Sequence, residues 1–212
     1  MRRTKAEAEE TRQRIICAAE KVFSLKGVSN ATLDDVANAA GVTRGAIYWH
    51  FANKTGLFLE LYNSAPLPQE DLIARILEDH DADALRIVEH AAVTWLKFFS
   101  TDKRRQRIYL ILLRCDYRGE LAIVLEKQLE AEARHLETLV QAFAKAEEKG
   151  QLRSNWTPLS ATQCFFWMIK GLCTNWLLSG QHFDLVTEGE SSIGRLFNGF
   201  RREPETGAPP AP

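Results

Sequence analysis

The chain has 212 residues, of which 45% are hydrophobic and 26% are charged, and its formal net charge is −1. These values are ordinary for a soluble globular protein with one or two cores. No uninterrupted run of about 18 apolar residues occurs, so we expect no transmembrane helix. No apolar segment follows the basic N-terminal residues, so we expect no signal peptide. We therefore expect a cytoplasmic protein that does not associate with membranes.

Charge is distributed unevenly along the chain. Residues 1–54 carry nine Lys or Arg against six Asp or Glu, a net +3, and the remainder carries 18 against 22, a net −4. A basic end on an acidic body fits a segment that faces DNA. Arg2, Arg3 and Lys5 predict a basic arm over residues 1–10, which either follows the DNA or is a solvated tail.

The cysteines and histidines do not indicate a metal site. Cys17, Cys115, Cys164 and Cys173 each lie in an apolar helical pattern and form no C-x-x-C pair, so we expect buried free thiols rather than a redox sensor. The run Glu78–Asp81 fits a solvated loop better than a set of metal ligands. We predict neither a metal nor a cofactor.

Apolar residues recur at helical spacing along nearly the whole chain, and no alternating strand pattern of useful length occurs. We predict an all-α fold of about nine helices, with an N-terminal three-helix helix-turn-helix domain and a C-terminal helical bundle. The predicted organisation is an arm (1–10), a DNA-binding domain (11–54), a ligand-binding and dimerisation domain (55–202) and a disordered tail (203–212).

The first predicted helix has one apolar face from Ile15 to Phe23, and Gly27 is a natural C-terminal stop. Thr32 is an N-cap candidate for a short helix over Leu33–Ala40, with acidic residues in its first turn.

A second short helix follows over Arg44–His50, and Asn53 or Thr55 can cap a fourth helix. Pro66 and Pro68 break or kink that fourth helix. Further helices are predicted at about residues 85–99, 108–113, 121–150 (with Gly150 as its stop), 159–178 and 190–201.

The stretch from Thr32 to Phe51 has the residue types that a helix-turn-helix requires. Small Ala37 and Ala40 allow two short helices to cross closely, and Gly41 supplies the tight turn between them. The residues spaced to fix the second helix on the core are Val42, Ile47 and Phe51.

The start and outer face of the second short helix carry the groups that DNA recognition needs. Arg44 can reach guanine in the major groove, and Gly45 and Ala46 allow the backbone to approach closely. Phosphate contacts are expected from Thr43, Tyr48, His50 and Lys54. The complete set of predicted DNA-binding residues is Thr32, Thr43, Arg44, Gly45, Ala46, Tyr48, Trp49, His50 and Lys54.

The alternative is that Tyr48 and Trp49 are core aromatics. Ile47 and Phe51 already occupy the core-facing positions, so we expect the two aromatics to point elsewhere.

The segment Thr32–Phe51, followed by Asn53-Lys54 and Leu57-Phe58, closely resembles the TetR-type repressor family. Its string Gly-Val-Thr-Arg-Gly-Ala-Ile-Tyr-Trp-His-Phe is similar to the AcrR branch, which controls multidrug efflux pumps. Looser similarities extend over about residues 1–190 and include Arg114-Cys-Asp-Tyr and Gly171-Leu-Cys-Thr-Asn-Trp-Leu. The resemblance implies a repressor that binds a palindromic double-stranded operator as a homodimer and is released by a small hydrophobic or cationic inducer.

Residues of the body are assigned to two predicted surfaces. The last two helices carry more apolar surface than one internal face needs, and the predicted dimer-interface residues are Phe165, Trp176, Ile193, Leu196, Phe197 and Phe200. A monomeric core using the same residues is the alternative. The predicted ligand-pocket residues are Trp95, Phe99, Ile108, Leu112, His135, Leu139, Phe166, Ile169, Lys170 and Thr174. Ordinary core packing is the alternative for each aromatic among them.

Basic side chains in the body are interpreted without a functional role. Lys170, inside an otherwise apolar helix, needs a partner, water or a surface position. We expect Lys103, Arg104, Arg105 and Arg107 to form a solvated helix start rather than a second DNA site.

The expected mechanism is a population shift, in which inducer and operator favour different spacings of the two headpieces. The helix from about Asn53 acts as the lever. A regulator controlled by a partner protein, without a small ligand, is the alternative. A helical enzyme is disfavoured because no nucleophile, acid–base set, metal cluster or phosphate loop stands out.

Overall fold

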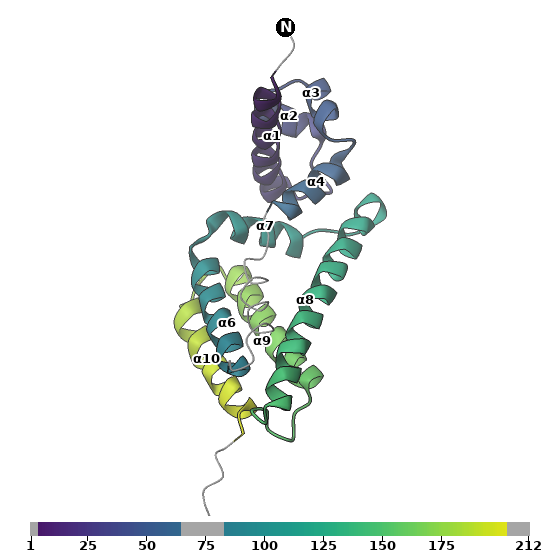
Figure 1. Cartoon of the computed structure of the whole chain (residues 1–212). Coiled ribbons are helices and arrows are strands. Elements are labelled where there is room, and N and C mark those ends of the chain that lie inside the picture. Colours follow the sequence, from purple (N-terminus) through teal and green to yellow (C-terminus); the bar gives the residue numbers. More distant parts are fainter. Residues whose placement is uncertain (1–3, 65–82, 203–212) are drawn as a thin grey trace, which may run out of the picture. The chain divides into compact units, whose positions relative to one another are not determined.

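The computed structural model describes residues 4–64 and 83–202 (Figure 1). Within these ranges it contains nine α-helices, one short 3-10 helix and a single β-bridge between Leu152 and Arg201, which confirms the predicted all-α fold. No helix of the described part is long and apolar enough to cross a bilayer. The sequence features that lie outside the described residues are Arg2 and Arg3, Pro66 and Pro68, the run 78–81 and the tail 203–212.

The chain divides into two compact units, and each unit is assembled from two stretches of sequence. The first unit comprises residues 1–66 and 102–130, and the second comprises residues 67–101 and 131–212. This division differs from the predicted boundary at residue 55, because a later stretch of chain belongs to the first unit.

The helices of the first unit are α1 (Lys5–Lys26), α2 (Leu33–Ala40), α3 (Arg44–His50), α4 (Lys54–Asn63), α7 (Lys103–Leu113), the 3-10 helix (Gly119–Leu121) and the start of α8 (Ala122–Glu148). Helix α1 contacts α2, α4 and α7. Its start at Lys5 corrects the predicted arm, since residues 5–10 are helical. Thr4 and Glu7 explain this start, because each side chain accepts a hydrogen bond from the backbone N–H of the other residue, at 3.3 and 2.7 Å.

The core of the first unit is formed by apolar side chains from all of its helices. Phe23 of α1 meets Phe58 of α4 edge to face, with ring centroids 5.7 Å apart. Ile108 and Ile111 of α7 are buried in the same cluster, together with Ile47 of α3. Helices α4 and α7 are therefore part of the same packed unit as the two short helices.

The second unit contains α6 (Ala84–Thr101), most of α8, α9 (Pro158–Leu178) and α10 (Leu185–Phe200). Helix α10 packs against both α6 and α9. Ring centroids 4.9 to 6.3 Å apart link five aromatic residues of its core, Phe143, Trp156, Phe165, Phe197 and Phe200. Helix α10 begins before its predicted start near residue 190, because Asp184 caps it by accepting from the backbone N–H groups of Val186 and Thr187 at 3.0 and 3.1 Å.

The cysteines are free, and their burial is not uniform. Cys173 is buried and Cys115 and Cys164 are half-buried, but Cys17 is exposed on α1, so the prediction of a buried thiol is wrong for Cys17. Burial raises the pKa of Cys115 to about 11 and that of Cys173 to about 12, which keeps both thiols protonated at neutral pH.

Candidate nucleic-acid interface

Helix α2 starts at a reciprocal cap between Thr32 and Asp35. The Thr32 hydroxyl accepts from the Asp35 N–H at 3.1 Å, and the Asp35 carboxylate accepts from the Thr32 N–H at 3.0 Å. The hydrogen bond from Lys26 at 2.6 Å, and then those from Thr32, lower the pKa of Asp35 to about 2. The Thr32 side chain, predicted to contact DNA, is thus used within the fold to cap α2.

Gly41 forms the turn between the two short helices. It adopts the left-handed conformation, with φ 64° and ψ 37°, which disfavours any residue with a side chain. Its N–H donates to the Asn38 carbonyl at 3.2 Å, and the Val42 N–H donates to the Ala37 carbonyl at 3.0 Å. Both short helices have the predicted bounds, because these turn and cap signals are local.

Helix α3 presents an apolar side to the core and an aromatic side to solvent. Thr43 caps its start by accepting from the Ala46 N–H at 3.2 Å. Ile47 is fully buried, whereas Tyr48 is 47% and Trp49 is 72% exposed, which confirms that the two aromatics point away from the core. The half-buried His50 packs its ring edge to face with Trp49, with centroids 4.5 Å apart.

Arg44 lies exposed at the start of α3 and is held by two neighbours. Its guanidinium is 3.0 Å from the Asp34 carboxylate of α2 and donates to the Tyr48 hydroxyl at 3.2 Å. It also lies over the Tyr48 ring, 5.6 Å from the centroid. The hydrogen bond to Tyr48, followed by the charge of Asp34, raises the pKa of Arg44 above its ordinary value. The helix thus presents a cation, a hydroxyl and a large aromatic to an approaching ligand.

Lys54, predicted to hold a phosphate, is used inside the first unit. Its ammonium donates to the backbone carbonyls of Ser29 and Ala31 at 3.2 and 3.3 Å and lies 3.8 Å from the Glu120 carboxylate. The side chain is only 17% exposed. It therefore ties the loop before α2 to the start of α4, a role that the sequence did not reveal.

The residues predicted to line a ligand pocket are divided between the two units. In the second unit, Trp95 and Phe99 of α6 are buried, and Phe99 lies 6.1 Å from the ring of Trp176. Ile108 and Leu112 instead pack in the core of the first unit. The predicted lining residues thus belong to both units, and the pocket that they would form stays a prediction.

The remaining predicted pocket residues lie on α8 and α9. Leu139 is buried, Ile169 and Thr174 are half-buried, and His135 and Phe166 face each other with ring centroids 6.2 Å apart.

Lys170 lies at the surface and has a partner, since its ammonium binds both carboxylate oxygens of Glu132 at 2.8 and 2.9 Å. Lys170 thus combines two of the three solutions expected for it, a partner and a surface position.

The side chains predicted for a dimer interface are mostly used inside one copy of the chain. The buried ones are Phe165, Trp176, Ile193, Phe197 and Phe200, whereas Leu196 is half-buried. Phe165, Phe197 and Phe200 contact Phe143, and Trp176 contacts Phe99, within one copy of the chain, while their role in a dimer interface stays a prediction.

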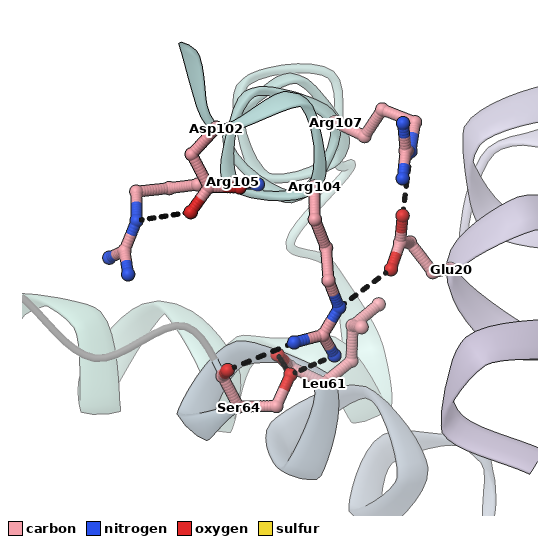
Figure 2. Close-up of polar contacts among 7 residues, drawn as sticks. All are labelled: Glu20, Leu61, Ser64, Asp102, Arg104, Arg105 and Arg107. Atoms are coloured by element: carbon pink, nitrogen blue, oxygen red, sulfur yellow. Dashed lines mark hydrogen bonds and ion pairs between the residues drawn. The ribbon is translucent and has the colours of Figure 1, made fainter. Parts of the chain in front are cut away.

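A polar cluster on α7 was missed from the sequence. Arg104 and Arg107, expected to be a solvated helix start, both bind the buried Glu20 of α1, at 3.1 and 2.6 Å (Figure 2). Arg105 pairs with Asp102 at 3.3 Å. No local signal links Glu20 to arginines more than 80 residues away, so the sequence alone did not indicate these pairs.

An exposed, capped α3 that has Arg44 at its start, contacts α2 and buries Ile47 in the core is the arrangement typical of a DNA-binding transcriptional regulator. Known proteins support this class. A family model described as "Bacterial regulatory proteins, tetR family" matches residues 15–61, and one described as "MAATS-type transcriptional repressor, C-terminal region" matches residues 83–201.

Relatives of the chain are similar over nearly their whole length. The chain is 38% identical over 202 residues to the transcriptional repressor BepR of Brucella suis, covering 95% of this chain and 97% of BepR. It is 33% identical over 196 residues to the regulator AcrR of Shigella flexneri, covering 92% and 91%. The crystal structure of NalD from Pseudomonas aeruginosa superposes with a TM-score of 0.85 at 36% identity, covering 94% of this chain and 100% of NalD. The chain belongs to the TetR family of bacterial regulatory proteins.

Proposed function

We propose that this protein is a ligand-responsive repressor that binds a palindromic operator and controls a multidrug efflux operon. The names of similar proteins support the proposal that the regulated genes encode an efflux pump. NalD is a secondary repressor of the MexAB-OprM multidrug efflux pump, and SmeT is the repressor of the Stenotrophomonas maltophilia pump SmeDEF. Because an operator is part of the bacterial genome, the protein acts in the cytoplasm.

The observation that carries the DNA-binding part of the proposal is the outer surface of α3. Arg44, Tyr48 and Trp49 are all exposed there, and Thr43 caps the start of the helix. An arginine at the start of a recognition helix can bind guanine with two hydrogen bonds, while hydroxyl groups contact phosphates. Other DNA contacts are also proposed, with less support from exposed side chains, and they are Thr43, Gly45, Ala46, His50 and Lys54.

TetR regulators act as dimers, and a single α3 reads too few bases for useful specificity. We assign the dimer surface to the exposed apolar residues of α9, since most residues chosen from the sequence are buried. Leu159, Trp167 and Leu178 are 56%, 65% and 54% exposed. An exposed Gly171 on the same helix allows close approach of a second copy.

The inducer is proposed to be a hydrophobic or cationic small molecule that binds among the aromatic side chains of the second unit. SmeT has been crystallised with triclosan, and the chain resembles that complex with a TM-score of 0.79 at 25% identity. The walls proposed for the site come from α6 and α9, including Trp95, Phe166 and Thr174. Inducer and operator then favour different states, so each weakens the binding of the other.

Selection and binding experiments test the proposal. The wild-type protein selects duplexes from a random-sequence pool, and we expect a palindromic site. Arg44→Ala should relax discrimination at one base position per half-site by about 1–3 kcal/mol. Melting temperature and operator affinity are then measured with antibiotics, dyes and biocides, triclosan included. If no compound raises the melting temperature or weakens operator binding, control by a partner protein is the better explanation.

A further inference from the structure

Glu20 is a charged side chain in an unusual position. It lies on α1 between residues of the apolar core, and its side chain is only 5% exposed. A buried carboxylate is costly unless each oxygen has a charged or hydrogen-bonding partner. When α1 is packed as in this structure, loss of the partners of Glu20 would therefore leave a buried carboxylate unpaired.

Both partners come from α7, one helical turn apart. The Nε of Arg107 donates to Oε1 of Glu20 at 2.6 Å, and the Nε of Arg104 donates to Oε2 at 3.1 Å (Figure 2). Each carboxylate oxygen is thus satisfied by a different arginine. A shift of α7 along or away from α1 would therefore require both arginine side chains to rearrange in order to keep these bonds.

Arg104 also reaches the end of α4. Its two terminal nitrogens donate to the backbone carbonyl of Ser64 at 3.2 Å and to the Ser64 hydroxyl at 2.8 Å. The Ser64 hydroxyl in turn donates to the Leu61 carbonyl at 2.7 Å (Figure 2). One guanidinium therefore joins three helices, α1, α4 and α7, which only the planar fork of arginine can do.

The cluster lies where the chain passes between its two units. The division places these crossings after residues 66, 101 and 130. Ser64 comes just before the first crossing and Arg104 just after the second. Only Asp102 separates α6 from α7, and it caps α7 by accepting from the Arg105 N–H at 2.9 Å. Arg104 thus binds two of the three crossing segments to α1.

A surface hollow lies further along α1 and α7. Its volume is about 240 Å³, and it is lined by residues 23–26 of α1, by Gly27 and by Leu110, Ile111 and Arg114 at the end of α7. Helix α7 is thus held in the first unit both by the buried Ile108 and Ile111 and by the polar cluster around Glu20.

We propose that Glu20, Arg104, Arg107 and Ser64 form a coupling latch, through which the state of α6 in the second unit is transmitted to the DNA-binding helices. Glu20 is a positioning residue that touches neither DNA nor inducer. This inference rests on the proposed ligand-responsive repression. With the latch closed, a shift of α6 moves α7 and the end of α4 together with α1; with it open, the shift is not passed on.

Coupling between two sites is reciprocal, so operator DNA can replace an unidentified inducer in the test. Hydrogen exchange of the full-length protein is measured with and without a duplex selected by the wild type from a random-sequence pool. In the wild type, we expect DNA to slow exchange in α3 and also, by about 5- to 150-fold, in the second half of α6. In Glu20→Gln, we expect the protection of α3 to remain and that of α6 to fall below about twofold.

Glu60→Gln is the matched control, because Glu60 pairs with Arg12 and joins α1 to α4 without involving α7. In the Glu60→Gln variant, DNA should still slow hydrogen exchange in α6.

The Arg104→Lys variant is a second test of the latch. It keeps the positive charge, but a lysine cannot bind Glu20 and Ser64 together, so the protection of α6 should be lost even if Glu20→Gln folds poorly. Protection of α6 that survives in either latch variant, or that is absent from the wild type while α3 is protected, would overturn the latch. A wild type that selects no duplex and shows no protection of α3 would instead contradict the proposed function.

Discussion

Arg44 is the residue on which base recognition is proposed to depend, and two neighbouring side chains hold its guanidinium in the free protein. The cation is shared between Asp34 and Tyr48 and is exposed to solvent. An exposed ion pair of this kind contributes little to stability, because solvent screens it. We therefore expect Asp34 to matter more for DNA binding than for folding, since its negative charge lies beside Arg44 on the proposed DNA-binding surface.

Removing that charge should strengthen DNA binding. Asp34→Asn releases Arg44 and reduces repulsion of the DNA backbone, so we expect affinity for any duplex to rise up to about fivefold at low salt. Fluorescence anisotropy over a range of salt concentrations measures this. Asp116→Asn is a control of similar exposure, paired with Arg118, and should change little. A weaker affinity of Asp34→Asn for the selected duplex would mean that Asp34 orients Arg44 for base contact.

At the scale of single helices, local signals determined most of what could be predicted. Thr32 and Thr43 cap α2 and α3, and Gly41 takes the left-handed turn, so the bounds of both helices followed from residues within one turn of each end. Helix α10 was placed too late, because the cap that Asp184 provides was not recognised in the sequence.

The cap of α2 makes part of the stability dependent on pH. The pKa of Asp35 is about 2 in the folded chain against an ordinary 3.8, so its contribution is complete above about pH 4 and is lost as the pH falls toward 2. We expect Asp35→Asn to be less stable than the wild type at pH 7 and to approach it at pH 2–3. Urea unfolding across this range measures the difference. A constant difference at every pH would argue against the cap as its source.

The contact between α6 and α10 depends on a glycine. A Cβ atom at Gly189 would lie 2.2 Å from Cδ1 of Leu96, and Leu96 is fully buried. We expect Gly189→Ala to destabilise the protein by about 1–3 kcal/mol in thermal or urea unfolding. Gly194→Ala, on the same helix with a nearest contact of 3.9 Å, should be neutral or stabilising. Equal effects of the two substitutions would show that the packing adapts.

At the scale of the whole molecule, the exposed row of α9 is proposed to bring two copies together. Trp167→Glu places a charge in the middle of that row, and we expect a monomer in analytical ultracentrifugation. Loss of the second headpiece should weaken operator binding by about 10²- to 10⁴-fold. Leu25→Glu, which alters an 86% exposed apolar residue of α1, should remain dimeric. A dimeric Trp167→Glu would exclude this face as the interface.

Tertiary pairing is what the sequence could not supply. Helical periodicity placed Phe165, Phe197 and Phe200 on apolar helix faces. It could not show whether these faces pack inside one copy of the chain or between two copies. In the same way, Arg104 and Glu20 each fit a surface helix until the fold brings α7 onto α1. Family resemblance indicated function because the recognition motif is continuous in sequence, whereas long-range polar pairs are not.

The assembly of the first unit from two separate stretches of chain limits how the protein can be taken apart. A fragment that ends with α4 lacks α7, and it would leave Glu20 without either arginine. A chimaera that joins the headpiece of one relative to the body of another at this point would pair Glu20 with the arginines of a foreign parent. Residues 1–66 and 102–130 are therefore the segment pair to exchange together. We expect a chimaera that exchanges both segments to be more stable than one that exchanges residues 1–66 alone.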